Sequence, residues 1–490
     1  MLCIRQHTTT TLLVALLVSL LTAAGPAQVV AVTPLVETTP VPSSGDAADD
    51  MAIWVHPTVP AQSLVIGTNK RAGIAVYDLA GSQLQYLADG ELNNVDLRYG
   101  FPSVPGNAIV TSGERSQNVL AVYFVDANAR RLVNVAARSI ALGFAVYGCC
   151  MYRSHVTGDY YFFGTSASGH VEQWRLFATS AGFVDAARVR QFEVGSISEG
   201  CVADDENGWF FVSEENVGIW RYGAEPGAGT ARVLVDATGS SGHLTADVEG
   251  LSIYYAAQGG GYLLASSQGS STFVVYQRAA PHAYLRTFQI TANAALGIDA
   301  VSGTDGIDVA NIGLGSNFPG GVFIAQDDSN PGANQNFKLV SWTDVANSAN
   351  PPLLVDSTFD VHGALCPPAA WSYRNGAGGN PQILTNQLPP VLGATWSSTL
   401  DCTGSSPGVA VIAVFGRPGA GFFVGPYEVL VDLSSPFLFS LSSPQASNAV
   451  PFSVPVPGNL GLCGMQVSVQ GACVDAQLVL SNAIDLTLGR

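Results

Sequence analysis

The sequence predicts an all-β protein: a six-bladed β-propeller followed by a small C-terminal β-sandwich-like domain. Three observations support this prediction. A two-strand pattern recurs six times, no long segment has the 3.6-residue periodicity of a helix, and the composition changes after about residue 364. The chain of 490 residues is also longer than one ordinary domain.

Each repeat opens with a short apolar strand that ends in small polar residues. These strands are predicted at Ser63–Lys70, Ala108–Glu114, Tyr160–Gly169, Trp209–Asn216, Tyr262–Gly269 and Gly321–Asp328. An alternating strand with an aromatic residue near its end follows each one, at Ile74–Leu79, Leu120–Val125, Val171–Leu176, Val217–Tyr222, Phe273–Arg278 and Phe337–Trp342. Repeats of about 50 residues built from several strands are typical of propeller blades. A β-sandwich or a jelly roll would not explain six copies of one pattern.

The polar ends of the first strands are expected to meet. In a propeller, equivalent ends of the inner strands gather at one end of the central channel. If the first strand of each repeat is the inner one, that end holds Lys70, Glu114, Glu214, Glu215, Gln268, Asp327 and Asp328.

The first 27 residues are predicted to be an export signal. Arg5 and His7 precede an apolar run from Leu12 to Ala24, and small residues follow this run. The run is too short for a lasting membrane span. We therefore expect a secreted protein, extracellular or periplasmic, that is not held in a membrane after cleavage. The propeller would occupy residues 28–363 and the accessory β domain residues 364–490.

The composition limits the partners of the protein. The formal net charge is −17, and only two residues are lysines, Lys70 and Lys338. Nucleic acid is excluded as a partner because binding its phosphates requires clustered positive charge. Bound cations explain such an acidic chain better. We expect a monomer.

The cysteines are expected to be structural. Four lie near the C-terminus and could form two disulfides in three connectivities: Cys366, Cys402, Cys463 and Cys473. Either Cys149 or Cys150 could bridge to Cys201, which would leave one free thiol. No cysteine pair has the spacing of a zinc site.

Acidic residues lie before or after many of the predicted strands. Calcium takes six to eight oxygen ligands, and these carboxylates would supply them, although no EF-hand loop is present. Lys70, Arg71 and Arg115 would add the positive charges that bind a phosphate ester. Calcium also lowers the pKa of bound water, so that no covalent intermediate is required.

Other phosphatase and hydrolase motifs are missing. The sequence contains no RHGxRxP, no cysteine followed six residues later by arginine, no P-loop and no GxSxG. The alternative that remains is a calcium-binding propeller without phosphatase activity, such as a lactonase-like enzyme or a binding module. A lactonase would not need Lys70, Arg71 and Arg115 beside its metal.

Eight segments between residues 37 and 345 together resemble one family, the β-propeller phytases. They are Asp46–Val55, Thr68–Tyr77, Leu92–Phe101, Glu199–Gly208, His243–Ala256, Tyr262–Gly269, Thr304–Val309 and Ala333–Lys338. The resemblance implies a six-bladed propeller that releases phosphate from phytate (myo-inositol hexakisphosphate), a 3-phytase type of phosphoric monoester hydrolase. Several Ca²⁺ ions would assist the attack of water, with phytate or calcium-phytate as the substrate.

The same resemblance implies roles for individual residues. Calcium-binding positions would be Glu37, Asp46, Asp49, Asp50, Asn94, Val95, Glu199, Glu215, Glu249, Gln268, Asp299, Asp305 and Asp327. The catalytic ions and the attacking water would lie among Glu199, Glu215, Glu249 and Asp305. Phosphate would be contacted by Lys70, Arg71, Arg115 and Tyr147.

Two positions depart from the family pattern. Ala167 stands where the family often has a phosphate-binding lysine, which implies a weaker second phosphate site. Met51 replaces a usual proline after Asp50. Residues 366–490 lie outside the resemblance.

Overall fold

A computed structural model describes residues 29–102, 108–362, 369–458 and 462–489. The predicted export signal lies outside this part of the chain. Within it, no helix is long and apolar enough to cross a membrane. Strands dominate, and the one α-helix is the short α1 (Trp342–Asn347).

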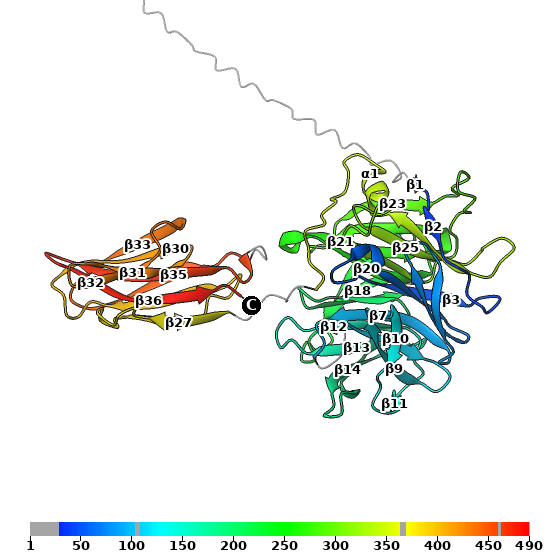
Figure 1. Ribbon diagram of the computed structural model, residues 1–490, viewed down its shortest axis with the longest axis horizontal. Coiled ribbons are helices and arrows are strands. Elements are labelled where there is room, and N and C mark those ends of the chain that lie inside the picture. Colours follow the sequence, from blue (N-terminus) through cyan, green and yellow to red (C-terminus); the bar gives the residue numbers. More distant parts are fainter. Residues whose placement is uncertain (1–28, 103–107, 363–368, 459–461, 490) are drawn as a thin grey trace, which may run out of the picture.

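Six sheets form blades 1 to 6, and in five of them four strands lie side by side in sequence order (Figure 1). Blade 1 contains β3 (Ala48–Trp54), β4 (Leu64–Asn69), β5 (Gly73–Asp78) and β6 (Gln83–Leu87). Blade 2 contains β7 (Leu92–Tyr99), β8 (Ala108–Glu114), β9 (Val119–Asp126) and β10 (Arg131–Asn134), and β11 (Ile140–Ala141) also pairs with β9. Blade 3 contains β12 (Cys149–Arg153), β13 (Tyr160–Gly164), β14 (His170–Ala178) and β15 (Val184–Glu193).

The remaining blades complete the ring. Blade 4 contains β16 (Cys201–Asp204), β17 (Trp209–Glu214), β18 (Gly218–Gly223) and β19 (Arg232–Ala237). Blade 5 contains β20 (Val248–Tyr255), β21 (Gly261–Ser267), β22 (Thr272–Gln277) and β23 (Tyr284–Ile290). Blade 6 contains β24 (Ile307–Ala310), β25 (Val322–Asp327) and β26 (Asn336–Ser341), and its fourth strand is β2 (Val36–Glu37).

The N-terminal strands close the ring. β2 pairs antiparallel with β26, so Val36 lies opposite Leu339. β1 (Val30–Val32) pairs in parallel with β23 at the outer edge of blade 5. Residues from the two ends of the propeller sequence therefore share sheets, as the neighbouring labels in Figure 1 show.

The first strand of each blade is the innermost one. β3, β7, β12, β16, β20 and β24 contact one another in this order, and β24 returns to β3. The repeated apolar strands found in the sequence are β4, β8, β13, β17, β21 and β25, which are the second strands. The expectation that they line the channel is therefore wrong. They read as continuous apolar runs because a neighbouring blade covers each of their faces.

The core lies between the blades. Separate clusters of buried side chains fill the interfaces, and successive residues of one strand contribute to different clusters. Val65 packs toward blade 6 beside Ile324, whereas Ile66 packs toward blade 2 beside Val110. Side-chain alternation along a strand thus holds each blade between its two neighbours.

Buried carboxylates link the inner strands, which do not pair with one another as a sheet. Asp50 accepts a hydrogen bond from Val95 N at 3.1 Å, and Asp96 accepts one from Met151 N at 2.8 Å. Asp205 accepts from Arg153 N at 3.0 Å, and Asp308 accepts from Ile53 N at 2.8 Å. Backbone groups that would otherwise be unsatisfied in the channel are paired in this way.

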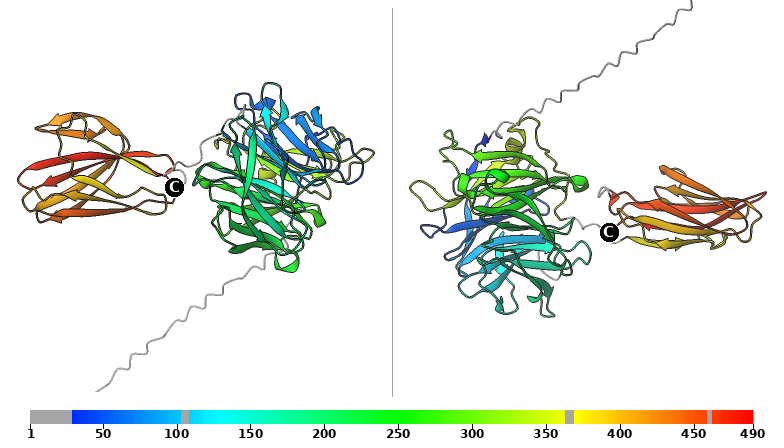
Figure 2. Two further views of the ribbon diagram at one scale, coloured as in Figure 1. Left: turned by 90° about the horizontal axis from the view of Figure 1, so that it is seen from below. Right: turned by 180° about the vertical axis from the view of Figure 1, so that it is seen from behind.

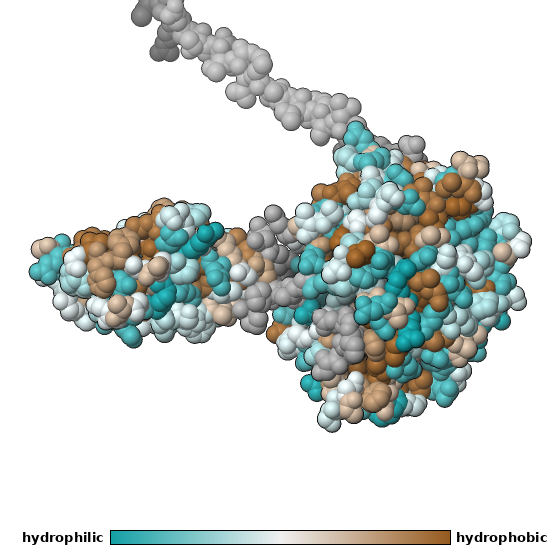
Figure 3. All heavy atoms as spheres, in the orientation of Figure 1, coloured by the Kyte–Doolittle hydropathy of each residue, from teal (hydrophilic) through white to brown (hydrophobic). Residues whose placement is uncertain are grey.

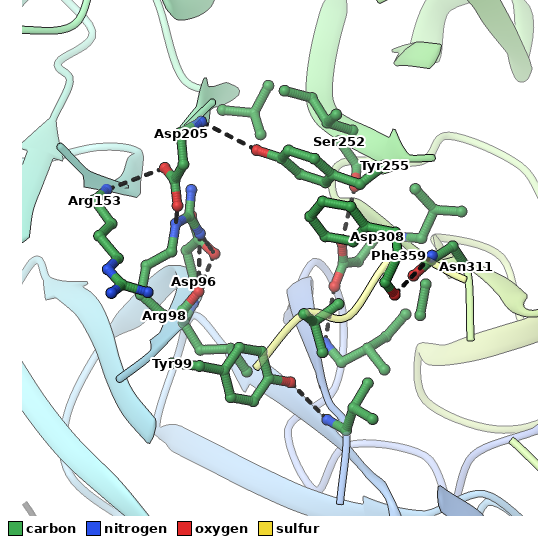
Figure 4. Close-up of a pocket in the computed structure, with 18 of the residues that line it drawn as sticks. Asp96, Arg98, Tyr99, Arg153, Asp205, Ser252, Tyr255, Asp308, Asn311 and Phe359 are labelled. Carbon is green, nitrogen blue, oxygen red and sulfur yellow. Dashed lines mark hydrogen bonds and ion pairs between the residues drawn. The ribbon is translucent and has the colours of Figure 1, made fainter. Parts of the chain in front are cut away.

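A segment after α1, Leu353–His362, crosses the end of the channel where the inner strands finish. We call it the strap. Leu354 N donates to the Tyr262 hydroxyl at 2.7 Å, and Asp356 N donates to the Tyr254 hydroxyl at 2.8 Å. Phe359 stacks on Tyr255 with ring centroids 5.0 Å apart. Figure 4 shows Phe359 at this end of the channel, near Asp308 and opposite Asp205 and Arg98.

The C-terminal strands form a β-sandwich. One sheet has the order β27 (Ala370–Arg374), β36 (Leu478–Thr487), β35 (Gln466–Val474), β30 (Gly408–Phe415) and β33 (Phe437–Gln445). The other contains β28 (Leu384–Leu388), β29 (Thr395–Asp401) and β34 (Ala449–Pro455), and a separate hairpin contains β31 (Pro418–Val424) and β32 (Tyr427–Val431). Side chains from both sheets share one core, and in Figure 2 these strands form a body apart from the blades.

The cysteines follow the sequence expectation only in part. Cys402 and Cys473 form a disulfide in the sandwich, and Cys366 lies outside the described residues. A bridge to Cys201 does not form: within the described chain Cys149, Cys150 and Cys201 are free thiols, all buried. They lie in the inner strands β12 and β16, where tight packing favours small apolar residues.

Candidate active site

Each blade places one residue at an equivalent position at the mouth of the channel. Regular pairing between the first two strands begins at Met51, Val95, Cys149, Cys201, Leu251 and Ile307. The residues two positions earlier are Asp49, Asn93, Tyr147, Glu199, Glu249 and Asp305. We call these six the mouth ring. Five of them are residues that the sequence assigned to the site.

The backbone is irregular at this position in three blades. The register shifts between Ala48 and Met51 in blade 1, and between Leu92 and Val95 in blade 2. Blade 5 has the same shift just after Val248. A β-bulge redirects side chains out of the regular alternation and is common near active sites. Here it carries Asp49, Asn93 and Glu249.

Glycine follows the mouth-ring residue in four blades. A Cβ at Gly148 would lie 2.0 Å from the carbonyl oxygen of Glu199, and one at Gly200 would lie 2.1 Å from that of Glu249. The backbones of neighbouring blades are therefore too close for any side chain. This close approach brings the acids of separate blades together.

Three carboxylates meet at the mouth. Glu199, Glu215 and Glu249 are buried, and each offers an oxygen within 4.8 Å of the oxygens of the others. Glu215 follows β17, whereas the other two belong to the mouth ring. Asp247 lies near them, since its charge contributes to the raised pKa of Glu215. The set has only oxygen donors, which hard cations prefer.

A lysine lies beside this cluster. Lys70 Nζ is 2.7 Å from Asp46 Oδ1, 3.1 Å from Asp49 Oδ1 and 2.7 Å from Asp305 Oδ2. Gln268 Nε2 donates to the other oxygen of Asp305. Burial disfavours the charge on Lys70, but Asp49 and Asp305 outweigh burial and hold its pKa above the ordinary value.

The acids of the mouth resist ionisation in the absence of a cation. Burial raises the pKa of Glu199 and Glu249, and the charges of nearby acids raise it further. Burial and then Asp49 raise the pKa of Asp305 to about 7, and burial and then Asp247 raise that of Glu215 to about 7. A bound cation would reverse this shift because opposite charge favours the ionised form.

Buried carboxylate oxygens without hydrogen-bond partners also indicate a cation site at the mouth. Both carboxylate oxygens of Asp49 and Oε1 of Glu215 are buried without a hydrogen-bond partner among the described residues. Lys70 is close to Asp49 Oδ1, but only as an ion pair. Buried charges of this kind are retained where they coordinate metals. The residues present therefore fit a group of hard cations such as calcium.

The predicted phosphate-binding residues lie along the same rim. Arg115 Nη2 is 3.4 Å from the carbonyl oxygen of Lys70, and Arg71 Nε donates to the carbonyl oxygen of Asp46 at 2.7 Å. The hydroxyl of Tyr147 lies close to the Glu199 carboxylate. Burial raises the pKa of Tyr147, with Glu199 as the next cause, so the phenol stays protonated and can donate.

Three predicted calcium ligands lie together elsewhere. Lys338 Nζ contacts Asp299 Oδ1 and lies 2.6 Å from Asp327 Oδ2, while Glu37 is opposite Lys338 across the β2–β26 pair. Lys338 is completely buried. In this structure an ammonium group therefore balances the negative charge of Asp299 and Asp327.

Three other predicted calcium-binding residues, Asp50, Asn94 and Val95, lie just inside the channel. Asp50 bonds to Val95 N, as described above, and burial raises its pKa, with Asp49 as the next cause. The carbonyl oxygen of Asn94 accepts hydrogen bonds from Ser112 Oγ at 2.7 Å and Cys149 Sγ at 3.3 Å. Asp50 and Asn94 are one residue deeper than the mouth ring, and Val95 is two residues deeper.

The expected gathering of strand ends is only partly correct. Lys70, Glu215 and Gln268 do reach the mouth. Glu114 instead binds Gln117 N at 2.8 Å in its own blade, and Glu214 binds Trp220 Nε1 at 2.7 Å. Glu214 and Glu215 are successive residues, and consecutive side chains of a strand point to opposite faces.

Sequence reasoning did not single out Asp247 or Asn93. Asp247 lies two residues before Glu249, inside a segment that carried the family resemblance. The family resemblance assigned the neighbouring Asn94 and Val95 to calcium but gave no role to Asn93. Alignment of the six inner strands would have identified it as the blade 2 counterpart of Asp49.

Two solved structures match part of the chain at low identity. Sqt1 of Chaetomium thermophilum, bound to the N-terminus of ribosomal protein L10, is 12% identical, with 63% of this chain and 90% of that chain covered and a TM-score of 0.35. The Cps50 (Swd1) beta-propeller domain of Myceliophthora thermophila is 8% identical, with 60% and 83% covered and a TM-score of 0.34.

The sequence itself has a much nearer relative. The 3-phytase of Bacillus subtilis (strain 168) is 45% identical over 327 residues, which is 64% of this chain and 84% of that protein. The profile of the phytase family matches residues 4–369. The chain therefore belongs to the phytase family and is a phosphoric monoester hydrolase.

Proposed function

We propose that the protein is a calcium-dependent phytase that converts phytate to lower inositol phosphates and inorganic phosphate. The observation that carries this proposal is the cluster of Glu199, Glu215 and Glu249 beside Lys70. Phytate is a polyanion, and a mouth lined by so many carboxylates would repel it. Cations held by those carboxylates would turn the same surface into one that attracts phosphate.

Bound at these acids, calcium would supply Lewis-acid chemistry toward a phosphate oxygen and an attacking water. Glu199, Glu249 and Glu215 would hold the ions, with Asp305 and Gln268 at one side. The Tyr147 hydroxyl would donate to a phosphate oxygen, and Lys70 and Arg115 would orient the ester. A bond would form between water oxygen and phosphorus, and the bond from phosphorus to the inositol oxygen would break. The attacking water would lose one proton, and the inositol oxygen would gain one to leave as a hydroxyl group.

No side-chain nucleophile is required. The thiols of Cys149, Cys150 and Cys201 are buried, and burial raises the pKa of each. A thiol becomes a nucleophile only when it is deprotonated and accessible. Direct attack by water suits the surroundings better. We also propose that the protein is secreted, in line with the apolar N-terminal run, and that it acts as a monomer.

The test is phosphate release from phytate by the purified chain, with calcium and after chelation. We expect activity with calcium, loss after EDTA and recovery when calcium is restored. Glu249→Gln should reduce kcat/KM by more than the roughly 10–100-fold that loss of an outer-shell metal partner costs. Glu193→Gln, at an exposed acid that bonds only to His170, is the matched control. Full activity after thorough chelation would exclude the proposed mechanism.

A further inference from the structure

Asn93 is the one member of the mouth ring to which neither the sequence nor the family resemblance gave a role. Its side chain is completely buried. Nδ2 donates to Glu199 Oε1 at 2.7 Å, across the mouth from blade 2 to blade 4. A neutral amide therefore holds one of the three clustered carboxylates.

The backbone around Asn93 directs the side-chain amide toward Glu199. The bulge between Leu92 and Val95 removes Asn93 from pairing with β8. On the following residue, Asn94, the carbonyl oxygen accepts hydrogen bonds from Ser112 and Cys149, which fixes the bulge from both sides. Asn93 Nδ2 also contacts Asn94 Oδ1 at 3.2 Å. The Oδ1 of Asn93 has no hydrogen-bond partner among the described residues, so the side chain is placed by burial, by the fixed backbone and by Nδ2. An amide already confined in this way loses little further entropy when it binds Glu199.

Without the hydrogen bond from Asn93, the Glu199 carboxylate would be less firmly held in its position. The charges of Asp49 and Asp305 repel it, whereas the nearby Tyr147 hydroxyl favours its ionised form and lowers its pKa. Hydrogen bonds from a fixed outer partner orient a metal-binding carboxylate and raise metal affinity. We propose that Asn93 is a positioning residue that fixes the Glu199 carboxylate for binding of the catalytic cations. This inference rests on the proposed calcium-dependent function.

The test uses the full chain with Asn93→Ala and the isosteric Asn93→Asp. Calcium binding is measured by calorimetry without substrate, and kcat and KM for phytate are measured separately. Both variants should bind calcium at the mouth about 10-fold more weakly or worse, and kcat should fall at saturating calcium while KM changes less than threefold.

Asn311→Ala is the matched control. Asn311 is also a buried asparagine, and its Nδ2 donates to the carbonyl oxygens of Asp356 and Phe359 at the other end of the channel. It should lower the melting temperature without changing calcium affinity. Calcium affinity and kcat within twofold of wild type in both Asn93 variants would overturn the inference, as would an equal loss of affinity in Asn311→Ala. If the wild type binds calcium but does not hydrolyse phytate, the proposed function fails, and the binding data alone decide the role of Asn93.

Discussion

At the scale of single residues, four glycines matter to the site as much as the acids beside them. Gly148, Gly200, Gly250 and Gly306 follow mouth-ring residues, and each lies against the backbone or the acid of another blade. Since a Cβ at any of them would lie closer than 3 Å to another atom, the blades would have to separate to accept it. The spacing of the acids is therefore set by residues that have no side chain.

Gly200→Ala tests this role. The new methyl group would lie 2.1 Å from Glu249 O, so blades 4 and 5 must move apart. We expect a loss of about 1–3 kcal/mol in the free energy of unfolding, as for overpacked cores, together with a fall in kcat. Urea denaturation and phytate assays measure the two effects.

Gly227→Ala is the control for this substitution, since a Cβ at Gly227 would meet no atom within 4 Å. Its unfolding free energy should stay within about 0.5 kcal/mol of wild type. Equal behaviour of the two variants would show that the blades tolerate a side chain at the mouth.

Residue types could be predicted from the sequence better than residue partners. Glu199, Glu215 and Glu249 were recognised, because carboxylates in a family pattern point to metal binding. The placement of Asp299 and Asp327 around Lys338 could not be predicted, because it depends on which strands become neighbours. Asn93 was missed because a neutral amide gains a role only through the acid that it contacts.

At the scale of elements, the strap covers the end of the channel that lies opposite the mouth. Its backbone and side chains bond to Tyr262, Tyr254 and Asn311, and His362 Nε2 lies 3.0 Å from the carbonyl oxygen of Val55. These contacts join blades 5, 6 and 1. The strap should therefore contribute to the free energy of unfolding of the propeller, although it has no regular secondary structure.

Removal of the strap should destabilise the propeller. A chain that ends at Pro352 lacks these hydrogen bonds, each worth about 0.5–1.5 kcal/mol net. Compared with a chain that ends at His362, its melting temperature should be lower by about 5 °C or more. Calorimetric melting of the two chains measures the difference. Identical melting temperatures of the two chains would show that the strap does not stabilise the propeller.

The sequence predicted that strands repeat, but not which strand of each blade is innermost. The second strands carry the clearest pattern because they are buried on both faces. Inner strands are shorter or bulged, and they contain polar residues such as Asp50 and Asp96 that bond to neighbouring strands. Bulges and the strap leave no periodic signal, since both are consequences of how blades pack together.

At the scale of the whole molecule, the C-terminal sandwich differs from the propeller in its surface. Its strands β31 and β33 expose large apolar side chains, including Phe422, Phe423 and Phe437. Figure 3 shows hydrophobic residues gathered on the sandwich. The family match ends near its first strand, at residue 369. All six residues of the mouth ring, and the acids clustered with them, lie in the propeller blades.

We expect phosphate release to be independent of the sandwich. A chain that ends at His362 retains all residues of the mouth and the whole strap. Its kcat/KM for phytate should stay within about twofold of that of the full chain, and its solubility should rise because the exposed apolar surface is gone. Parallel assays and light scattering check both points. A loss of more than 10-fold in kcat/KM would place part of the site in the sandwich.

The closure of the ring by β2 has a consequence for how the protein folds. Val36 pairs with Leu339, so the last blade is incomplete until residues some 300 positions apart in sequence meet. A chain made from its N-terminus must keep residues 36 and 37 unpaired until the sixth blade has been synthesised, since their partner strand is β26. The ring therefore assembles late and all at once, and the mouth, which draws on every blade, cannot form on a partly made chain.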